Sequence, residues 1–227
     1  MNKLITLKND IKTVFVGDTH GDFETTLSLF KQYPPEKTRL VFLGDYVDRG
    51  DMSLENIEFL LKQRELYPDR VILLAGNHDY YGGNMFPSSF WDNLIADEIQ
   101  QWRNTFRALP LFVSTGDIIA CHAALPDVKN LKDLDNPIEE DIRTAVWGDY
   151  GSSRYADSIR PMFDEGWLER TLKQVNKKIL IRGHQPGLEA DTYGSGKLIT
   201  LMTSRFLYEL RIGVVEKGGN KVRIVYL

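Results

Sequence analysis

Short apolar runs alternate with amphipathic stretches in the first half of the chain. The runs at 13–16, 40–43 and 71–74 have the length and the aliphatic character of buried strands. Between them, 23–33 carries apolar residues at helical spacing, and 53–67 is expected to be a helix that ends before the next proline. Strands that alternate with helices are typical of βαβ units, so we predict a parallel sheet in this half.

The second half of the chain is predicted to add more strands than helices. Helical periodicity marks 89–109 and 165–177, whereas 126–151 is expected to be loop with a short helix. A Gly-Asp turn should join 111–115 and 118–123 as a hairpin. Further strand-like runs are found at 178–185, 197–206, 208–217 and 221–227, the last two joined by Gly-Gly-Asn. We therefore predict an α/β fold, with two facing mixed sheets flanked by helices, in a single domain over 1–227.

Polar residues follow the strand-like runs directly, and all four histidines of the chain occupy such positions. In α/β sheets ligands bind beyond the carboxyl ends of strands, so these segments are expected to converge. The candidate ligands offer oxygen and nitrogen but no thiolate, which suits Mn²⁺, Fe or Zn²⁺ better than a structural zinc cluster. The candidates are Asp18, His20, Asp45, Asp48, Asn77, His78, His122 and His184.

Composition excludes several other classes of protein. A formal net charge of -4 argues against a strongly cationic nucleic-acid binder, so we expect no nucleic-acid partner. A single cysteine, Cys121, cannot form a disulfide framework. The chain contains no apolar run of membrane-spanning length and no apolar stretch typical of a signal peptide. We expect a cytoplasmic monomer without a membrane partner.

Glycine and arginine add a phosphate-binding character to these loops. Gly17, Gly44 and Gly76 each precede a polar residue at a strand end, where glycine allows tight turns and close backbone approach. Arg49 directly follows Asp48, and its forked guanidinium suits the oxygens of a phosphate group.

Five motifs in order then resemble those of the calcineurin-like metallophosphoesterases. They are GDTHG at 17–21, GDYVDRG at 44–50, GNHD at 76–79, CHAALPD at 121–127 and RGHQP at 182–186. GDYVDRG in particular is similar to the Ser/Thr phosphoprotein phosphatase branch, and the chain length resembles that of its compact bacterial, archaeal and phage members. The resemblance extends from about residue 13 to 205 and implies a metallophosphoesterase-like β-sandwich core.

The resemblance also implies a role for each site residue. Asp18 and His20 would bind a first metal ion, Asp45 would bridge two, and Asn77, His122 and His184 would bind the second. Mn²⁺ is the expected metal, with Fe or Zn²⁺ as alternatives. His78 would act as the general acid with Asp48 holding its other ring nitrogen, while Arg49 and Asn77 would bind phosphate oxygens. Arg160 is our preferred second phosphate-binding arginine, and Arg154 and Arg182 are the other candidates.

The predicted reaction is hydrolysis of phosphoserine or phosphothreonine in proteins, with phosphotyrosine as a tolerated substrate. A hydroxide shared by the two metal ions would attack phosphorus directly. A symmetrical dinucleoside polyphosphate hydrolase, related to bis(adenosine) tetraphosphatase, is the alternative; it would need stacking aromatics such as Tyr80, Tyr81 or Phe86. A catalytically dead binding module is a third hypothesis, which the intact ligand set opposes. Packing in the protein interior is an equally good interpretation of Tyr80 and Tyr81.

Several positions depart from the family pattern, and two of them bear on site residues. Asp79 stands where the phosphoprotein branch usually has glutamate, although the neighbouring Asn77 and His78 are present. Tyr208 lies one position out of register with the active-site tyrosine of the eukaryotic enzymes, so the role of that tyrosine is not carried over.

Overall fold

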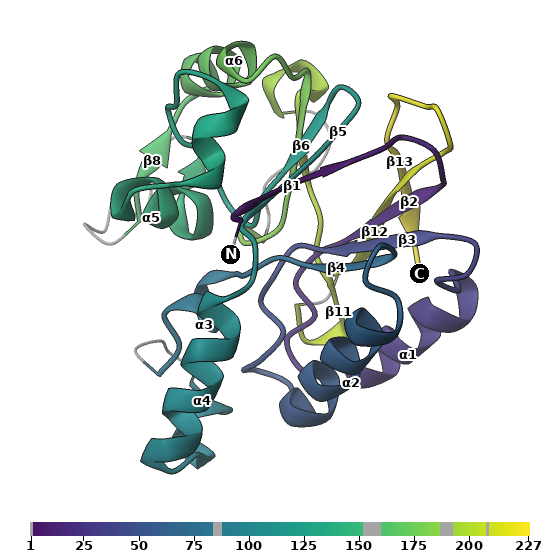
Figure 1. Cartoon of the computed structure of the whole chain (residues 1–227), viewed down its shortest axis with the longest axis vertical. Helices are drawn as coiled ribbons and strands as arrows, with labels where there is room; N and C mark the ends of the chain where they lie inside the picture. Colours follow the sequence, from purple (N-terminus) through teal and green to yellow (C-terminus); the bar gives the residue numbers. More distant parts are fainter. Residues whose placement is uncertain (1, 84–87, 152–159, 187–192, 208) are drawn as a thin grey trace.

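Two β-sheets lie face to face, and helices cover their outer sides (Figure 1). This arrangement is seen in a computed structural model that describes residues 2–83, 88–151, 160–186, 193–207 and 209–227. The predicted fold class, two mixed sheets flanked by helices, is confirmed.

The first sheet contains the three strands that the first half of the sequence predicts. β2, β3 and β4 are parallel neighbours, and β12 runs antiparallel to β2 on the other side. β13 forms the predicted C-terminal hairpin with β12, and β11 also pairs with β12. The strand bounds are β2 (Thr13–Val16), β3 (Arg39–Phe42), β4 (Val71–Leu73), β11 (Thr203–Ser204), β12 (Glu209–Val215) and β13 (Arg223–Tyr226).

The second sheet has the order β1-β5-β6-β9-β10. The antiparallel pair β5 and β6 is the hairpin predicted around the Gly-Asp turn, while the other neighbours in this sheet are parallel. The strand bounds are β1 (Leu4–Leu7), β5 (Phe112–Thr115), β6 (Ile118–Ala120), β9 (Ile179–Arg182) and β10 (Leu198–Thr200). A separate two-stranded pair joins β7 (Asp149–Tyr150) to β8 (Met162–Phe163).

Six α-helices and four short 3-10 helices are described. The α-helices are α1 (Phe23–Gln32), α2 (Ser53–Leu66), α3 (Asn77–Tyr80), α4 (Ala96–Arg107), α5 (Glu139–Trp147) and α6 (Glu165–Gln174). The 3-10 helices are η1 (Trp91–Asn93), η2 (Leu131–Asp135), η3 (Tyr193–Gly196) and η4 (Arg205–Leu207). Within the described ranges, none of these helices combines the length and the apolar character that crossing a membrane requires.

Alternation along the strands explains the layered core. Phe15 belongs to the cluster between the sheets, together with Val113 of β5 and Ile181 of β9. Its neighbours Val14 and Val16 belong to the other cluster, which also contains helix residues. Successive side chains of a strand point to opposite faces, so a sheet covered on both sides has no polar face. This is why the first-half strands are continuous apolar runs.

Four parts of the structure differ from the sequence-based expectation. The helix expected at 89–109 is divided, because Leu94 and Ile95 are extended and the Glu98 carboxylate accepts the Ile95 N–H, which starts a new helix at α4. The run expected at 197–206 is divided into β10 and β11. Neither β1 nor the β7–β8 pair was expected from the sequence.

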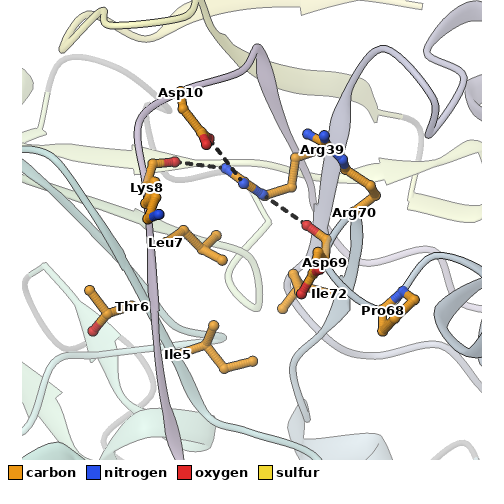
Figure 2. A pocket seen from close by; sticks show the side chains of 10 residues that line it. All are labelled: Ile5, Thr6, Leu7, Lys8, Asp10, Arg39, Pro68, Asp69, Arg70 and Ile72. Atoms are coloured by element: carbon orange, nitrogen blue, oxygen red, sulfur yellow. Dashed lines mark hydrogen bonds and ion pairs between the residues drawn. The ribbon is translucent and has the colours of Figure 1, made fainter.

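Arg39, the first residue of β3, closes the end of the sandwich where β3 begins (Figure 2). Its guanidinium donates to the backbone oxygens of Lys8 and Asp69 at 2.9 and 3.2 Å and to the Asp10 carboxylate at 3.3 Å. Arg39 is buried and lines a pocket of about 560 Å³. None of the residues lining this pocket is a histidine, and the polar residues predicted to form a site follow the other end of β3. This large pocket is therefore not the candidate active site.

Candidate active site

The loops at the carboxyl ends of five strands converge on one small pocket. Its lining contains three segments that follow β2, β3 and β4, together with the segment after β9. His122, after β6, lies behind this lining and contacts it through Asn77 and Asp45. The pocket is lined by Asp18, His20, Asp45, Arg49, Asn77, His78, Arg160, His184, Pro186 and Leu207. The structure thus brings together residues that are distant in the sequence, such as Asp18 and His184, which are 166 positions apart.

Asp45 occupies the centre of the cluster. Its Oδ2 lies 3.5 Å from Nε2 of His20 and 3.5 Å from Nε2 of His122. Two groups of potential metal ligands have their atoms within 4.8 Å of one another, namely His20, Asp45 and His78, and Asp45, His122 and His184. Because Asp45 belongs to both groups, the geometry fits two neighbouring cations that share one carboxylate.

The two histidines beside Asp45 are oriented as metal-binding histidines are. Nδ1 of His20 contacts the backbone oxygen of Val47 at 2.8 Å, and Nδ1 of His122 contacts that of Leu43 at 3.0 Å. A carbonyl only accepts, so Nδ1 carries the hydrogen and Nε2 presents its lone pair towards Asp45. Burial lowers the pKa of His20 to about 3 and also lowers that of His122, which keeps both rings neutral.

Asn77 and His184 form the other side of the cluster. Oδ1 of Asn77 lies 2.9 Å from Nε2 of His122 and 2.9 Å from Nδ1 of His184. The backbone N–H of His184 lies 3.1 Å from both carboxylate oxygens of Asp18. Nε2 of His184 is buried without a hydrogen-bond partner. The donor set of carboxylate, imidazole and amide groups fits divalent transition metals.

Electrostatics of the two central carboxylates also favours cations. Burial and the neighbouring Asp45 raise the pKa of Asp18 well above its ordinary value. Burial acts on Asp45 in the same direction, but His122, His78 and His20 in their protonated forms outweigh it and lower the pKa of Asp45 to about 2. The two buried carboxylates therefore repel each other, and a bound cation would offset that repulsion.

His78 and Asp48 form a close buried pair at the edge of the cluster. Nδ1 of His78 lies 2.6 Å from Oδ2 of Asp48, and Oδ1 of Asp48 accepts the backbone N–H of Phe90 at 2.9 Å. Burial lowers the pKa of His78, but the Asp45 carboxylate and the hydrogen bond to Asp48 outweigh it and leave the pKa above its ordinary value. The His78 ring is therefore suited to donate a proton near neutral pH.

Backbone strain is concentrated in these loops. Of the seven non-glycine residues with positive φ in the described ranges, five belong to the site, namely His20, Asp45, Asp48, Arg49 and His184. A left-handed conformation costs a residue with a side chain on the order of 1–3 kcal/mol and persists where the surroundings enforce it. The close packing of the loops shows that enforcement, because a Cβ at Gly76 or Gly183 would collide with the Asp45 or Asp18 carboxylate, respectively.

Asp79 holds two loops of the site together through backbone hydrogen bonds, a role that its position in GNHD did not reveal. Its carboxylate accepts the backbone N–H groups of Asp45 at 2.7 Å, Tyr46 at 3.0 Å and Gly76 at 2.9 Å. These bonds tie the loop after β4 to the loop after β3. The shorter side chain of aspartate thus reaches the backbone of both loops.

Two arginines line the pocket, as expected for anion binding. The Arg49 side chain is exposed, and Arg160 lies against the ring of Trp147 at 5.4 Å. Nη1 of Arg160 lies 3.3 Å from Asp149, and the other oxygen of that carboxylate lies 3.4 Å from Nε2 of His184. Asp149, which lies between the arginine and the histidine, was not among the predicted site residues, because a carboxylate in a two-residue strand has no distinguishing local pattern.

The remaining arginine candidates do not enter the pocket. Arg182 is fully buried and donates to the backbone oxygen of Gly148 at 2.9 Å, and its guanidinium lies over the Tyr150 ring. Arg182 therefore packs in the interior and does not line the pocket that holds the other site residues. Arg154 lies outside the described residues.

The aromatic candidates for a nucleotide site lie away from the pocket. Tyr80 is contacted by Lys3 and Arg107 through its ring, and Tyr81 donates to Glu139 at 2.6 Å. Neither tyrosine lines the pocket. Both pack against the hydrophobic core instead. Phe86 and Tyr208 lie outside the described residues.

Comparison with known proteins identifies the family of this chain. Residues 11–215 match the family described as calcineurin-like phosphoesterase. The chain is 32% identical over 214 residues to the serine/threonine-protein phosphatase 4 catalytic subunit of Candida glabrata, covering 83% of this chain and 67% of that protein. It is 30% identical over 229 residues to the serine/threonine-protein phosphatase PP2A-like PPG1 of Candida albicans, covering 88% and 53%.

The curated relatives are longer, and the chain spans between 44% and 67% of the length of those it matches. Among solved structures, it resembles a protein serine/threonine phosphatase from Saccharomyces cerevisiae with a TM-score of 0.82 at 22% identity, covering all of this chain and 84% of that one. It also resembles a cold-active protein tyrosine phosphatase with a TM-score of 0.70 at 17% identity, covering all of this chain and 78% of that one. At these identities the structures support the fold alone.

Proposed function

Because the chain belongs to the calcineurin-like phosphoesterase family, we propose that it is a metal-dependent phosphatase that hydrolyses phosphoserine and phosphothreonine in proteins. The names of the relatives support this substrate class, since both reported sequence relatives are serine/threonine-protein phosphatases. Phosphotyrosine is a secondary substrate in this proposal.

The observation that carries the proposal is that Asp45 belongs to two groups of potential metal ligands, and that His78, a member of one of them, is paired with Asp48. Such an arrangement combines a dinuclear metal site with a proton donor. Hydrolysis of an unactivated phosphate ester needs both. The metal ions activate water and neutralise phosphoryl charge, and the proton donor assists the alkoxide, which is a poor leaving group.

Two metal ions would be held by the buried ligands of the pocket. Asp18 and His20 would hold one ion, and Asn77, His122 and His184 the other, with Asp45 shared between them. When bound, divalent cations lower the pKa of water and neutralise charge on phosphoryl oxygens. Mn²⁺ is the metal we propose, and Fe or Zn²⁺ would suit the same donor set.

The other residues of the pocket would act on the substrate itself. Arg49 and Arg160 would bind the phosphoryl oxygens, and the amide of Asn77 lies where it could assist. Arg160 would be kept in place by Asp149 and by the Trp147 ring. Protonated His78 would give its proton to the leaving oxygen, while Asp48 holds the ring in orientation and favours its charged form.

The placement of the tyrosines weighs against the dinucleotide alternative. A dinucleoside polyphosphate hydrolase would need aromatic side chains beside the metal ligands to stack on adenine. Tyr80 and Tyr81 contact basic and acidic side chains elsewhere instead. The intact ligand set likewise supports an enzyme over a catalytically dead binding module. The single domain over 1–227, the monomeric state and the cytoplasmic location stay predictions.

Replacing His78 with asparagine tests the proposed chemistry. Asparagine keeps a polar contact with Asp48 but cannot act as an acid, so kcat on an alkyl phosphomonoester should fall by about 10²–10⁴-fold. The loss should be much smaller for p-nitrophenyl phosphate, whose leaving group needs little protonation. Equal losses on both esters would remove His78 from the role of general acid, and near-normal rates on both would do the same.

A further inference from the structure

A second pocket adjoins the candidate active site and shares Arg49 with it. It has a volume of about 560 Å³, and we call it the flanking groove. One wall is the start of α2 with the loop before it, and the other is η1 with the start of α4. The flanking groove is lined by Arg49, Gly50, Asp51, Ser53, Leu54, Glu55, Ser89, Phe90, Asn93, Leu94 and Glu98.

The wall around η1 is bonded directly to the catalytic loops. The Phe90 N–H donates to the same Asp48 carboxylate that holds His78, at 2.9 Å. The Ser89 hydroxyl accepts the Arg49 N–H at 3.1 Å, and the Trp91 indole donates to the His78 backbone oxygen at 3.1 Å. The groove is therefore held in a fixed position relative to the phosphate-binding pocket, as a pre-formed binding surface requires.

Outside the buried Phe90, the side chains of the groove are apolar at two positions and acidic at three. Leu54 is 43% exposed and Leu94 is half-buried, which offers apolar surface for side chains or aliphatic stems. Asp51, Glu55 and Glu98 are exposed carboxylates, whereas Arg49 is the one cationic residue in the described lining. Arg49 also lines the active-site pocket, where it would bind phosphate, so the charges that remain for the groove are the three carboxylates.

We propose that the flanking groove binds the peptide chain next to the phosphorylated residue and selects substrates with basic side chains there; this rests on the proposed phosphatase function. Lysine and arginine suit both features, since their aliphatic stems can pack on Leu54 and Leu94 while their charges reach the carboxylates. Acidic flanking residues would face three like charges and be disfavoured. The enzyme would therefore act preferentially on phosphorylated residues that have lysine or arginine nearby in the sequence.

Four phosphoserine peptides test this preference. They carry three lysines or three glutamates, on either the N-terminal or the C-terminal side of the phosphoserine. On at least one side, kcat/KM should favour lysine over glutamate by about tenfold at low salt, the combined effect of several exposed charge pairs. The ratio should shrink towards one at 0.5 M salt, because exposed charges are then screened.

Variants assign the preference to the groove. Glu55→Lys should reduce the lysine-to-glutamate ratio about threefold or more, and Asp51→Asn should reduce it in the same direction. Glu65→Lys makes the same charge change on an exposed residue of α2 outside the groove, so it should leave both the ratio and the basal activity unchanged.

The outcomes separate this inference from the proposed function. Hydrolysis of all four peptides at equal rates would contradict the proposal that the flanking groove selects basic substrates, but it would be consistent with the phosphatase function. An equal change of the ratio in the Glu55→Lys and Glu65→Lys proteins would also contradict that proposal, because long-range charge would then explain the preference. If neither the peptides nor p-nitrophenyl phosphate were hydrolysed with Mn²⁺ present, the proposed function would fail, and the inference with it.

Discussion

Replacing Asp48 with asparagine separates the charge of this carboxylate from its geometry. The side chains have nearly the same shape, and the amide oxygen can still accept the Phe90 N–H that Oδ1 accepts at 2.9 Å. The ionised oxygen that lies 2.6 Å from Nδ1 of His78 is lost. The variant should therefore fold normally and differ in the acidity of one imidazole.

The size of the effect follows from that contact. A hydrogen bond to a charged group contributes about 1.5–3 kcal/mol, which corresponds to a decrease of about one to two units in the pKa of His78. His78 acts in its protonated form, so a lower pKa removes activity from the alkaline side. At pH values above both pKa values, kcat on an alkyl ester should fall by about 10- to 100-fold.

A pH profile of kcat measures this shift directly. The alkaline limb should move to lower pH by about one to two units on an alkyl phosphomonoester, while p-nitrophenyl phosphate responds less. The melting temperature and the metal content of the variant serve as controls for folding and for the metal site. An alkaline limb that stays in place, with kcat close to that of the unmodified enzyme, would refute the coupling between Asp48 and His78.

Three further substitutions test other parts of the structure. Asp45→Asn should lower the metal content after dialysis from two ions per chain, as measured by mass spectrometry, because the shared carboxylate is lost; two ions at full occupancy would contradict its bridging position. Arg160→Ala should reduce kcat/KM on phosphomonoesters about tenfold by removing a charged contact to phosphate, and an unchanged value would exclude it as a ligand. Arg39→Met should lower the free energy of unfolding in urea by about 2–4 kcal/mol, since it loses the bonds to Lys8 and Asp69, while kcat is retained. A variant as stable as the parent would show that the sandwich closes without this guanidinium.

The sequence predicts the layered fold because the residues that end each strand are close to it in the sequence. The runs that form β2, β3 and β4 are each followed by a glycine and a polar residue, and those residues mark where the chain turns. For the same reason Asp18, Asp45 and His78 could be assigned to one edge of a sheet without knowledge of the second sheet.

What the sequence could not predict depends on contacts between distant segments. Asp149 contacts Arg160 and His184 only because β7 pairs with β8, a two-residue pairing with no periodicity to recognise. Likewise, nothing local shows that Phe90 bonds to Asp48 or that Asp79 accepts N–H groups from the loop after β3. The local sequence also does not show that Arg182 is fully buried whereas Arg160 lines the pocket.

The most direct test of the account is a competition between two substrates in one reaction. A phosphoserine peptide and diadenosine tetraphosphate are supplied at equal concentration to the metal-depleted protein, and Mn²⁺ is then added. The account predicts no turnover before the metal is added and, afterwards, release of phosphate from the peptide in clear excess over cleavage of the dinucleotide. Preferential cleavage of the dinucleotide, or turnover that does not depend on added metal, would contradict it.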